Sequence, residues 1–161
     1  MHEQEQEQDR RQAGTCLVFR VESVACALPV AAVVETMRPL PLQRVKSAPP
    51  IVAGLAMIRG RATPVIDTAR LLGTAAATDT ARFVTVAVGD RQVALAVTSV
   101  VGLRAVAGAE LRALPPLLAG AEIGAVSAIG ALDRELLLLL RGVRLVPESV
   151  FAATTPTAGT P

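Results

Sequence analysis

The residues of this chain that could do chemistry are few and lie far apart. Its single histidine, His2, sits in a polar N-terminal stretch, which excludes a histidine-dependent triad. The two cysteines, Cys16 and Cys26, have no histidine near them and lack the paired spacing of a zinc site. No glycine-rich phosphate-binding motif is present. The sequence therefore predicts a protein that is not an enzyme and that holds no metal or cofactor.

One basic residue stands out from this background. Arg59 precedes Gly60 between two largely apolar segments, "GLAMI" and "RATPVI", so we expect Arg59 and Gly60 at or near the tip of a β-hairpin, with Gly60 supplying the turn. Arginine is favoured in protein interfaces because its planar guanidinium bonds bidentately while its stem packs on apolar groups, and here Met57 and Ile58 precede it. This pattern indicates partner binding.

Composition narrows the class of protein. Apolar residues make up 52% of the 161 residues and aromatic residues only 2%, so an aliphatic core holds Phe19, Phe83 and Phe151 as its only rings. The 16 basic residues are scattered and the net charge is +2, and without Trp or Tyr the chain lacks a platform for stacking bases. No apolar run approaches the roughly 18 residues that span a bilayer, and no secretory signal is visible. We expect a cytoplasmic protein that neither binds nucleic acid nor inserts into a membrane.

Short alternating segments separated by turn signals predict an all-β fold. In residues 17–21 the side chains of Leu17, Phe19 and Val21 share one face, and Glu22–Ser23 then reverses the chain. That turn would place Cys16 opposite Pro29 and Cys26 opposite Phe19, so the thiols are offset and we expect no disulfide. Further along, Gly89–Asp90 is a second hairpin turn, and Asp67 is placed to cap a short helix over residues 68–72 that ends at Gly73.

The chain contains a hidden repeat. One constant shift along the chain takes Leu17 to Val84, Phe19 to Val86 and Leu28 to Leu95 without a gap, and "RATPVIDTARLL" resembles "ELLLLLRGVRLV" at a slightly larger shift. The repeat predicts two lobes of roughly five short strands each, a number typical of small β-barrels. We place the first barrel at about 15–82 and the second at about 83–150, between tails at 1–14 and 151–161 whose polar or small residues cannot order themselves.

The order of these segments resembles a known family. A hairpin that ends in "ALPVAAVVETM" is followed by "PLPLQRVKSAPPIVAGLAMIRGRATPVIDTARLLG", a second hairpin and a closing "AVSAIGALDRELLLLL". This pattern is similar to the CheW-like domain of bacterial chemosensory systems over essentially residues 15–150. The resemblance implies two packed five-stranded SH3-like barrels with short connecting helices, and a non-catalytic adaptor between methyl-accepting chemoreceptors and a CheA-type histidine kinase.

The resemblance also implies which residues meet the partners. Val33, Gly54 and Arg59 match positions important for partner binding, and their neighbours Glu35, Met37, Met57 and Gly60 are added as candidates. The groove between the barrels would take the helical receptor tip, and one end of the first barrel would meet the regulatory domain of the kinase. The chain departs from the family in having Met57 where asparagine is common.

Two alternatives stay open on the sequence. A divergent paralogue could compete for the same kinase or receptor sites without activating the kinase. A small-molecule or peptide-binding barrel is a third possibility, and it would require an apolar pocket within a lobe.

Overall fold

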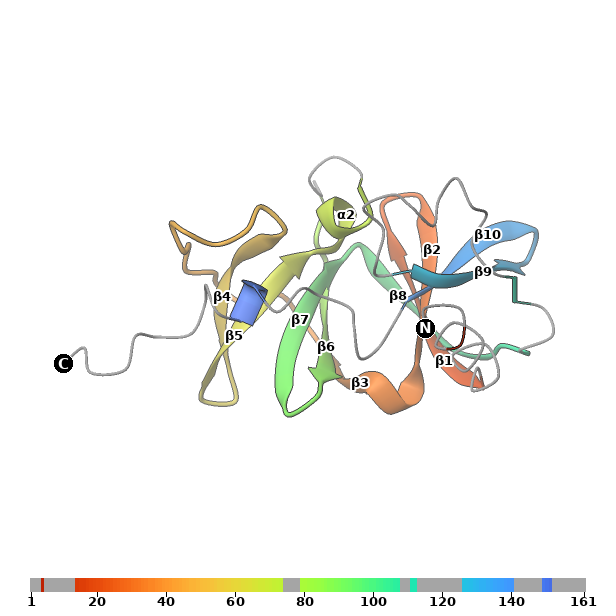
Figure 1. Cartoon of the computed structure of the whole chain (residues 1–161), viewed down its shortest axis with the longest axis horizontal. Helices are drawn as coiled ribbons and strands as arrows, with labels where there is room; N and C mark the ends of the chain where they lie inside the picture. The colour runs from red at the N-terminus through yellow and green to blue at the C-terminus, as the bar shows by residue number, and fades with distance from the viewer. Residues whose placement is uncertain are drawn as a thin grey trace.

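The computed structural model describes residues 4, 14–73, 79–107, 111–112, 126–140 and 149–151. In this part of the chain two five-stranded sheets account for nearly all regular structure. Sheet A has the strand order β8-β1-β2-β10-β9 and lies on the right of Figure 1, and sheet B has the order β3-β6-β7-β5-β4 and lies on the left. The expected all-β class is confirmed.

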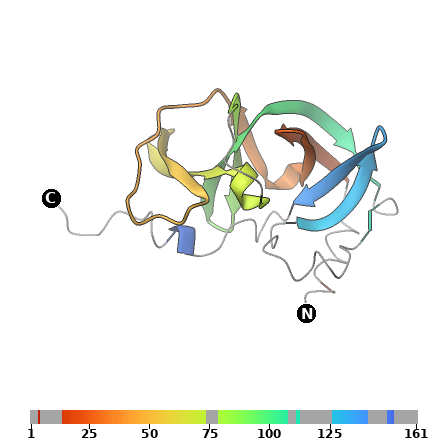
Figure 2. The same cartoon turned by 90° about the horizontal axis from the view of Figure 1, so that it is seen from above.

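The bounds of the strands are short and regular. Sheet A consists of β1 (Thr15–Val21), β2 (Val24–Pro29), β8 (Ser99–Ala105), β9 (Val126–Leu132) and β10 (Glu135–Leu140). Sheet B consists of β3 (Val33–Met37), β4 (Val52–Ile58), β5 (Arg61–Asp67), β6 (Arg82–Val88) and β7 (Arg91–Val97). The pairs β2–β10 and β5–β7 are parallel and the other neighbours are antiparallel. The short helices include η1 (Val30–Ala32) and α2 (Thr68–Leu71), and residues 149–151 are also helical. In Figure 2, α2 lies between the two sheets.

The repeat in the sequence is also a repeat of structure. The shift that relates Leu17 to Val84 takes the whole of β1, Thr15–Val21, onto β6, Arg82–Val88. The slightly larger shift takes β4, Val52–Ile58, onto β9, Val126–Leu132. Replacing each strand of sheet A by its repeat equivalent gives the strand order of sheet B. The two sheets therefore have the same topology, each built from equivalent strands of the repeat.

The sheets do not, however, divide the chain at residue 82 as the predicted barrels do. Sheet B takes β3 to β7, whereas sheet A combines β1 and β2 with β8 to β10. The third strand of each repeat pairs with the first strand of the other repeat. Thus β3 pairs with β6, and β8 pairs with β1. Periodicity identifies the repeat unit but not the partner of each strand, and so the ranges 15–82 and 83–150 describe repeats rather than sheets.

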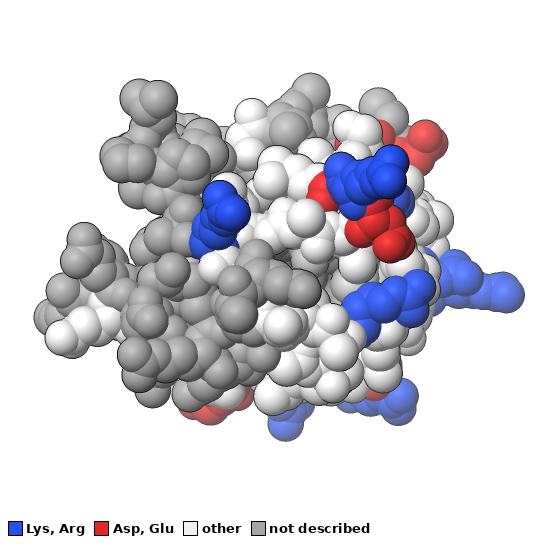
Figure 3. Space-filling model, turned by 90° about the vertical axis from the view of Figure 1, so that its right-hand side faces the viewer, with Lys and Arg blue, Asp and Glu red and all other residues white. Residues whose placement is uncertain are grey.

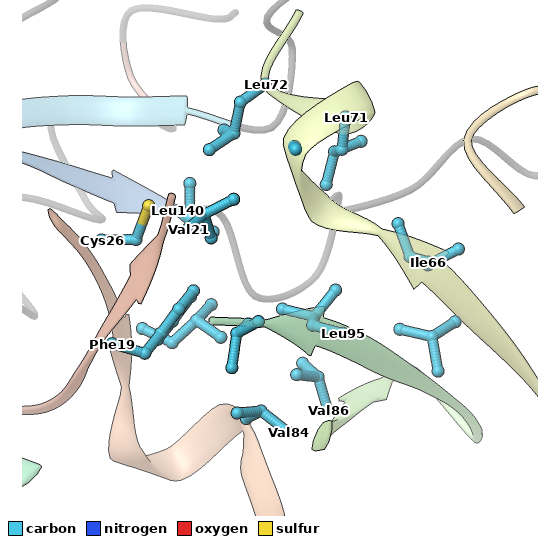
Figure 4. Packing of buried hydrophobic residues seen from close by; sticks show 14 of the residues in the cluster. Phe19, Val21, Cys26, Ile66, Leu71, Leu72, Val84, Val86, Leu95 and Leu140 are labelled. Carbon is cyan, nitrogen blue, oxygen red and sulfur yellow. The ribbon is translucent and has the colours of Figure 1, made fainter. Parts of the chain in front are cut away.

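The main hydrophobic core lies between the two sheets. Figure 4 shows Phe19 and Cys26 from sheet A facing Val84, Leu95 and Ile66 from sheet B. Leu71 and Leu72, at the end of α2, belong to the same cluster. The central cluster also includes Phe151, as the composition predicted, although the predicted C-terminal tail began at this residue. The rest of the tails at 1–14 and 151–161 lies outside the described residues, apart from residues 4 and 14.

Two smaller clusters fill the other face of each sheet. Cys16, Val18, Leu137 and Leu139 belong to the outer cluster of sheet A, and Ile58, Val65 and Phe83 belong to that of sheet B. The central strands are thus buried on both faces. From the sequence of β1, only the face of Leu17, Phe19 and Val21 was predicted to be buried. Its other face also carries apolar residues and is buried too, as is typical of strands covered on both sides.

Several local predictions are confirmed. Cys16 pairs with Pro29 and Phe19 with Cys26, and both cysteines are free and buried. The side chain of Asp67 accepts a hydrogen bond from the Arg70 backbone N–H at the start of α2. Gly73 follows that helix with φ 84°, in the left-handed region that a helix end favours.

Candidate functional site

The candidate site is built around a two-residue turn between β4 and β5. Ile58 pairs with Arg61, which leaves Arg59 and Gly60 as the turn residues, and their φ angles are 48° and 78°. A turn with two positive φ angles matches the right-handed twist of a hairpin, and Asn-Gly is its usual sequence. Gly60 has the predicted role, whereas Arg59 takes a conformation that non-glycine residues seldom adopt.

The side chain of Arg59 is held by a carboxylate from the opposite edge of sheet B. Its Nε–H donates to Oε2 of Glu35 on β3, at a nitrogen–oxygen distance of 2.8 Å. The Glu35 carboxylate raises the pKa of Arg59 by this hydrogen bond and by its charge. The Arg59 side chain remains 78% exposed, whereas the Glu35 side chain is 26% exposed. The pair therefore fixes the direction of an exposed cation.

A β-bulge in β3 places Glu35 for this contact. Val33 pairs with Val86 and Glu35 with Thr85, so that Val34 is the extra residue. Residues directly opposite each other share a face, so Val33 faces the central cluster with Val86, and Glu35 lies on the outer face with Thr85. Without the bulge, residues 33 and 35 would share one face.

The other candidates lie along the same two strands. Val33 packs against the central cluster, and Met37, which pairs with Phe83, packs against the outer cluster of sheet B. Met57 is 66% exposed, and it lies on the opposite face of β4 from Ile58. Met57 and the buried Ile58 therefore line two different sides of the hairpin.

Gly54 acts through close approach of backbone. A Cβ built at this position would lie 2.8 Å from the carbonyl oxygen of Gln43 and 3.2 Å from the Cβ of Leu42. The neighbouring Leu55 exchanges two backbone hydrogen bonds with Gln43, each 2.8 Å long. Gly54 thus lets the segment that contains Gln43 lie against β4, some distance along the strand from the turn.

Comparison with known proteins decides the family. The CheW-like domain matches residues 15–150 of the chain. The chain belongs to the CheW-like family. No curated protein is similar enough to count as a match. Among solved structures, the crystal structure of the scaffolding protein TtCheW from Thermoanaerobacter tengcongensis superposes with a TM-score of 0.73 at 18% identity, covering 83% of this chain and 92% of that one. This likeness supports the CheW-like fold.

CheW-like proteins are non-catalytic scaffolds of chemotaxis signalling, so the prediction that the chain is not an enzyme is confirmed by its family. No group of three or more His, Cys, Asp or Glu residues within the described part could hold a metal ion. Burial raises the pKa of the Cys26 thiol to about 12, and also raises that of Cys16, which leaves both in the unreactive thiol form. No helix in the described ranges is long and apolar enough to cross a bilayer.

The surface of this CheW-like domain carries charges of both signs. On the face shown in Figure 3, basic and acidic side chains adjoin at one place, and further basic side chains are scattered over largely uncharged surface. In sheet A, Arg20 and Glu135 form an ion pair with 2.6 Å between Nη2 and Oε2. The described part of that face shows no continuous basic groove of the kind that single-stranded nucleic acid follows.

The structure brings together some of the predicted residues and separates others. Glu35 and Arg59 are in direct contact, and Gly60 completes the turn. Val33, Met37, Gly54 and Met57 lie on β3 and β4, but on different faces or further along. The sequence did not indicate Thr85, whose hydroxyl contacts the backbone of Glu35, because a threonine in an apolar strand is indistinguishable from any other β-branched strand residue.

Proposed function

We propose that this CheW-like domain is a cytoplasmic adaptor that couples the cytoplasmic tip of methyl-accepting chemoreceptors to the regulatory domain of a CheA-type histidine kinase. Family membership supports the class of function. The observation that supports the role of this particular surface is Arg59, a cation that is 78% exposed and yet held by Glu35. An arginine fixed in advance loses less conformational freedom when it binds a partner.

The proposal assigns the β4–β5 turn and β3 to partner contact. Val33, Glu35, Met37, Gly54, Met57, Arg59 and Gly60 remain the candidate residues, with Arg59 as the direct contact and Glu35 as its support. Gly54 contributes by holding the segment around Gln43 against β4. Met57, exposed on the other side of the hairpin, would add apolar contact area if the partner spans the turn.

The experiment is a calorimetric titration of the protein with the kinase regulatory domain from the same organism, and separately with a receptor cytoplasmic fragment. Arg59→Glu should abolish binding to at least one of the two while leaving the thermal unfolding curve unchanged. Arg82→Glu is the matched control. Arg82 is also an exposed arginine of sheet B, but it pairs with Val97 at the end of the sheet remote from the β4–β5 turn. Binding of both partners by Arg59→Glu at wild-type strength would remove the turn from the interface.

A second measurement separates the adaptor from a competitor. Adding the protein to a reconstituted mixture of receptor fragments and kinase should raise kinase activity if it couples them. A divergent paralogue that only occupies the sites would lower the activity. The ligand-binding alternative has less support, because it requires an apolar pocket within a lobe. On the outer face of each sheet, the side chains of the described strands pack against one another in a buried cluster.

A further inference from the structure

Thr85 is a buried polar residue that makes both its hydrogen bonds to one other residue. It lies on β6 and is fully buried. Its hydroxyl accepts a hydrogen bond from the Glu35 backbone N–H at 3.0 Å and donates one to the Glu35 carbonyl oxygen at 3.2 Å. These contacts lie at the bulge of β3, where the regular ladder of backbone hydrogen bonds is interrupted. The hydroxyl thus holds the backbone of the residue whose carboxylate holds Arg59.

The second repeat provides an internal comparison. The shift that takes β1 onto β6 relates Val18 of β1 to Thr85, and Glu35 to Gly102 of β8. The register of β1 and β8 also shifts here: Val18 pairs with Gly102 and Phe19 with Val100, which leaves Val101 as the extra residue. An equivalent bulge therefore forms opposite a buried valine. The fold does not need a hydroxyl at this position in order to make the bulge.

The two bulges differ in the residue that pairs with the buried threonine or valine. In sheet B the residue opposite the threonine is Glu35, which is paired with Arg59, whereas in sheet A the residue opposite the valine is Gly102, which has no side chain. The shift that takes β4 onto β9 takes Arg59 onto Asp133, so the described part of sheet A carries no such ion pair between its bulge and its turn. Threonine occurs in the copy that has a carboxylate to position.

We propose that Thr85 is a positioning residue for partner binding: its hydroxyl fixes the backbone of Glu35, so that the Glu35 carboxylate holds Arg59 by Nε and leaves both Nη groups directed to the partner. This inference rests on the proposed function and extends it to a buried residue outside the partner surface. It predicts that removing one buried hydroxyl changes the behaviour of an exposed arginine on another strand.

The first test uses the free protein and needs no partner. Proton exchange of the Arg59 Nε–H is measured by nitrogen-15 NMR in the wild type, in Thr85→Val and in Thr85→Ser, with Arg82 as the reference for an exposed arginine. Exchange at Arg59 should be several-fold slower than at Arg82 in the wild type, and it should approach the Arg82 rate in Thr85→Val. Thr85→Ser, which keeps the hydroxyl, should behave as the wild type. Unchanged exchange at Arg59 in Thr85→Val overturns the proposal.

The second test measures binding by calorimetry with whichever partner requires Arg59. Thr85→Val should bind about tenfold more weakly, because an Arg59 side chain that is no longer held must lose conformational freedom when it binds the partner. Thr85→Ser keeps the hydroxyl and should retain most of the wild-type affinity. The double variant Thr85→Val with Glu35→Gln should bind no more weakly than Glu35→Gln alone, because both changes release the same arginine. A merely structural role of Thr85 would lower the unfolding temperature without this dependence on Glu35, and that result overturns the proposal.

The two tests separate the failure of this inference from that of the proposed function. If the NMR result is as expected but the wild type binds neither partner, the adaptor function is wrong and the positioning of Arg59 stands. If the wild type binds through Arg59 and Thr85→Val binds equally well, the positioning role is wrong. Should Thr85→Val fail to fold, Thr85→Ala removes the hydroxyl without adding a methyl group and decides in its place.

Discussion

Arg59, in the turn between β4 and β5, and Glu35, on β3, join the two edge strands of sheet B through a 2.8 Å ion pair. Ion pairs exposed to solvent contribute little to folding, because water screens them and two long side chains must be ordered. We therefore infer that the main effect of this pair is to orient the Arg59 side chain rather than to stabilise the fold. The Glu35 carboxylate also raises the pKa of Arg59, by this hydrogen bond and by its charge.

A charge exchange tests whether direction or mere pairing matters. Glu35→Arg and Arg59→Glu each place like charges together, and each single variant should lose partner binding. The double variant restores an ion pair, but it presents a carboxylate where the partner meets a guanidinium. We expect it to fold as the wild type does in thermal unfolding and still to show no binding in calorimetric titration. Recovery of binding by the double variant would mean that the pair matters only for the local structure.

The local elements of the fold could be predicted because their signals are local. The turn at Gly60, the cap at Asp67 and the hairpin that places Cys26 opposite Phe19 each depend on residues close together in the chain. The repeat could be found because equivalent strands kept the same spacing of apolar residues, and β6 follows β1 residue for residue.

The pairing of β3 with β6 and of β8 with β1, each across the two repeats, could not be predicted in this way. β3 and β8 bear apolar residues suited to either sheet, and a partner strand far along the chain leaves no mark in local periodicity. The bulge at Val34 was missed for a related reason, since a bulge changes which face a residue occupies without changing the residue types. Glu35 was chosen as a candidate from the family resemblance, and only the structure connects it to Arg59.

Gly54 should be more sensitive to alanine than Gly60. An added Cβ at Gly54 would lie 2.8 Å from the Gln43 carbonyl oxygen, a backbone atom, so Gly54→Ala must displace that segment. Forcing extra volume into a packed site typically costs about 1–3 kcal/mol. At Gly60 there is open space, and alanine would bear only the strain of a positive φ, about 1 kcal/mol.

Urea unfolding of the two alanine variants measures this difference. Gly60→Asn is the control for the turn, because asparagine tolerates the left-handed region better than alanine does, and it should be closer to the wild type than Gly60→Ala. If Gly54→Ala were as stable as the wild type, the segment around Gln43 would have to move away from β4 at no cost.

Stability should fall in alkaline solution because of the buried Cys26 thiol. Burial raises its pKa to about 12 from an ordinary value of 9.0, so the unfolded chain loses its proton first. The stabilisation by the neutral thiol is therefore complete below pH 9 and is lost as the pH rises toward 12, at up to about 1.4 kcal/mol per pH unit. The sequence contains no tyrosine and a single lysine, so few other side chains titrate in this range.

Urea unfolding at a series of pH values from 8 to 11 is the measurement for Cys26. Cys26→Ala should be somewhat less stable at pH 8, because it leaves a small cavity, but it should lose less stability than the wild type on going to pH 11. Parallel curves for the wild type and Cys26→Ala would show that another group causes the alkaline loss. Burial also raises the pKa of Cys16, so Cys16→Ala is the matched variant for its share of the effect.

Phe151 should matter to stability although it lies near the end of the chain. Its ring is buried in the central cluster, and the guanidinium of Arg91, at the start of β7, lies 4.3 Å from the ring centroid. Replacing a buried phenylalanine by alanine removes apolar contacts and leaves a cavity, which typically costs about 3–5 kcal/mol. Arg91→Ala removes the cation–π contact of a partly exposed side chain, together with its exposed ion pair to Asp90, and should cost about 0.5–1 kcal/mol.

These costs are measured by urea unfolding of Phe151→Ala, Phe151→Leu and Arg91→Ala. Phe151→Leu keeps an apolar side chain while removing the ring, so its stability should lie between those of Phe151→Ala and the wild type. Combining Arg91→Ala with Phe151→Leu should cost little more than Phe151→Leu alone, because the cation has already lost the ring over which it lies. If Phe151→Ala were as stable as the wild type, residues 149–151 would not be part of the core in solution, and the cooperative unit of the fold would end before them.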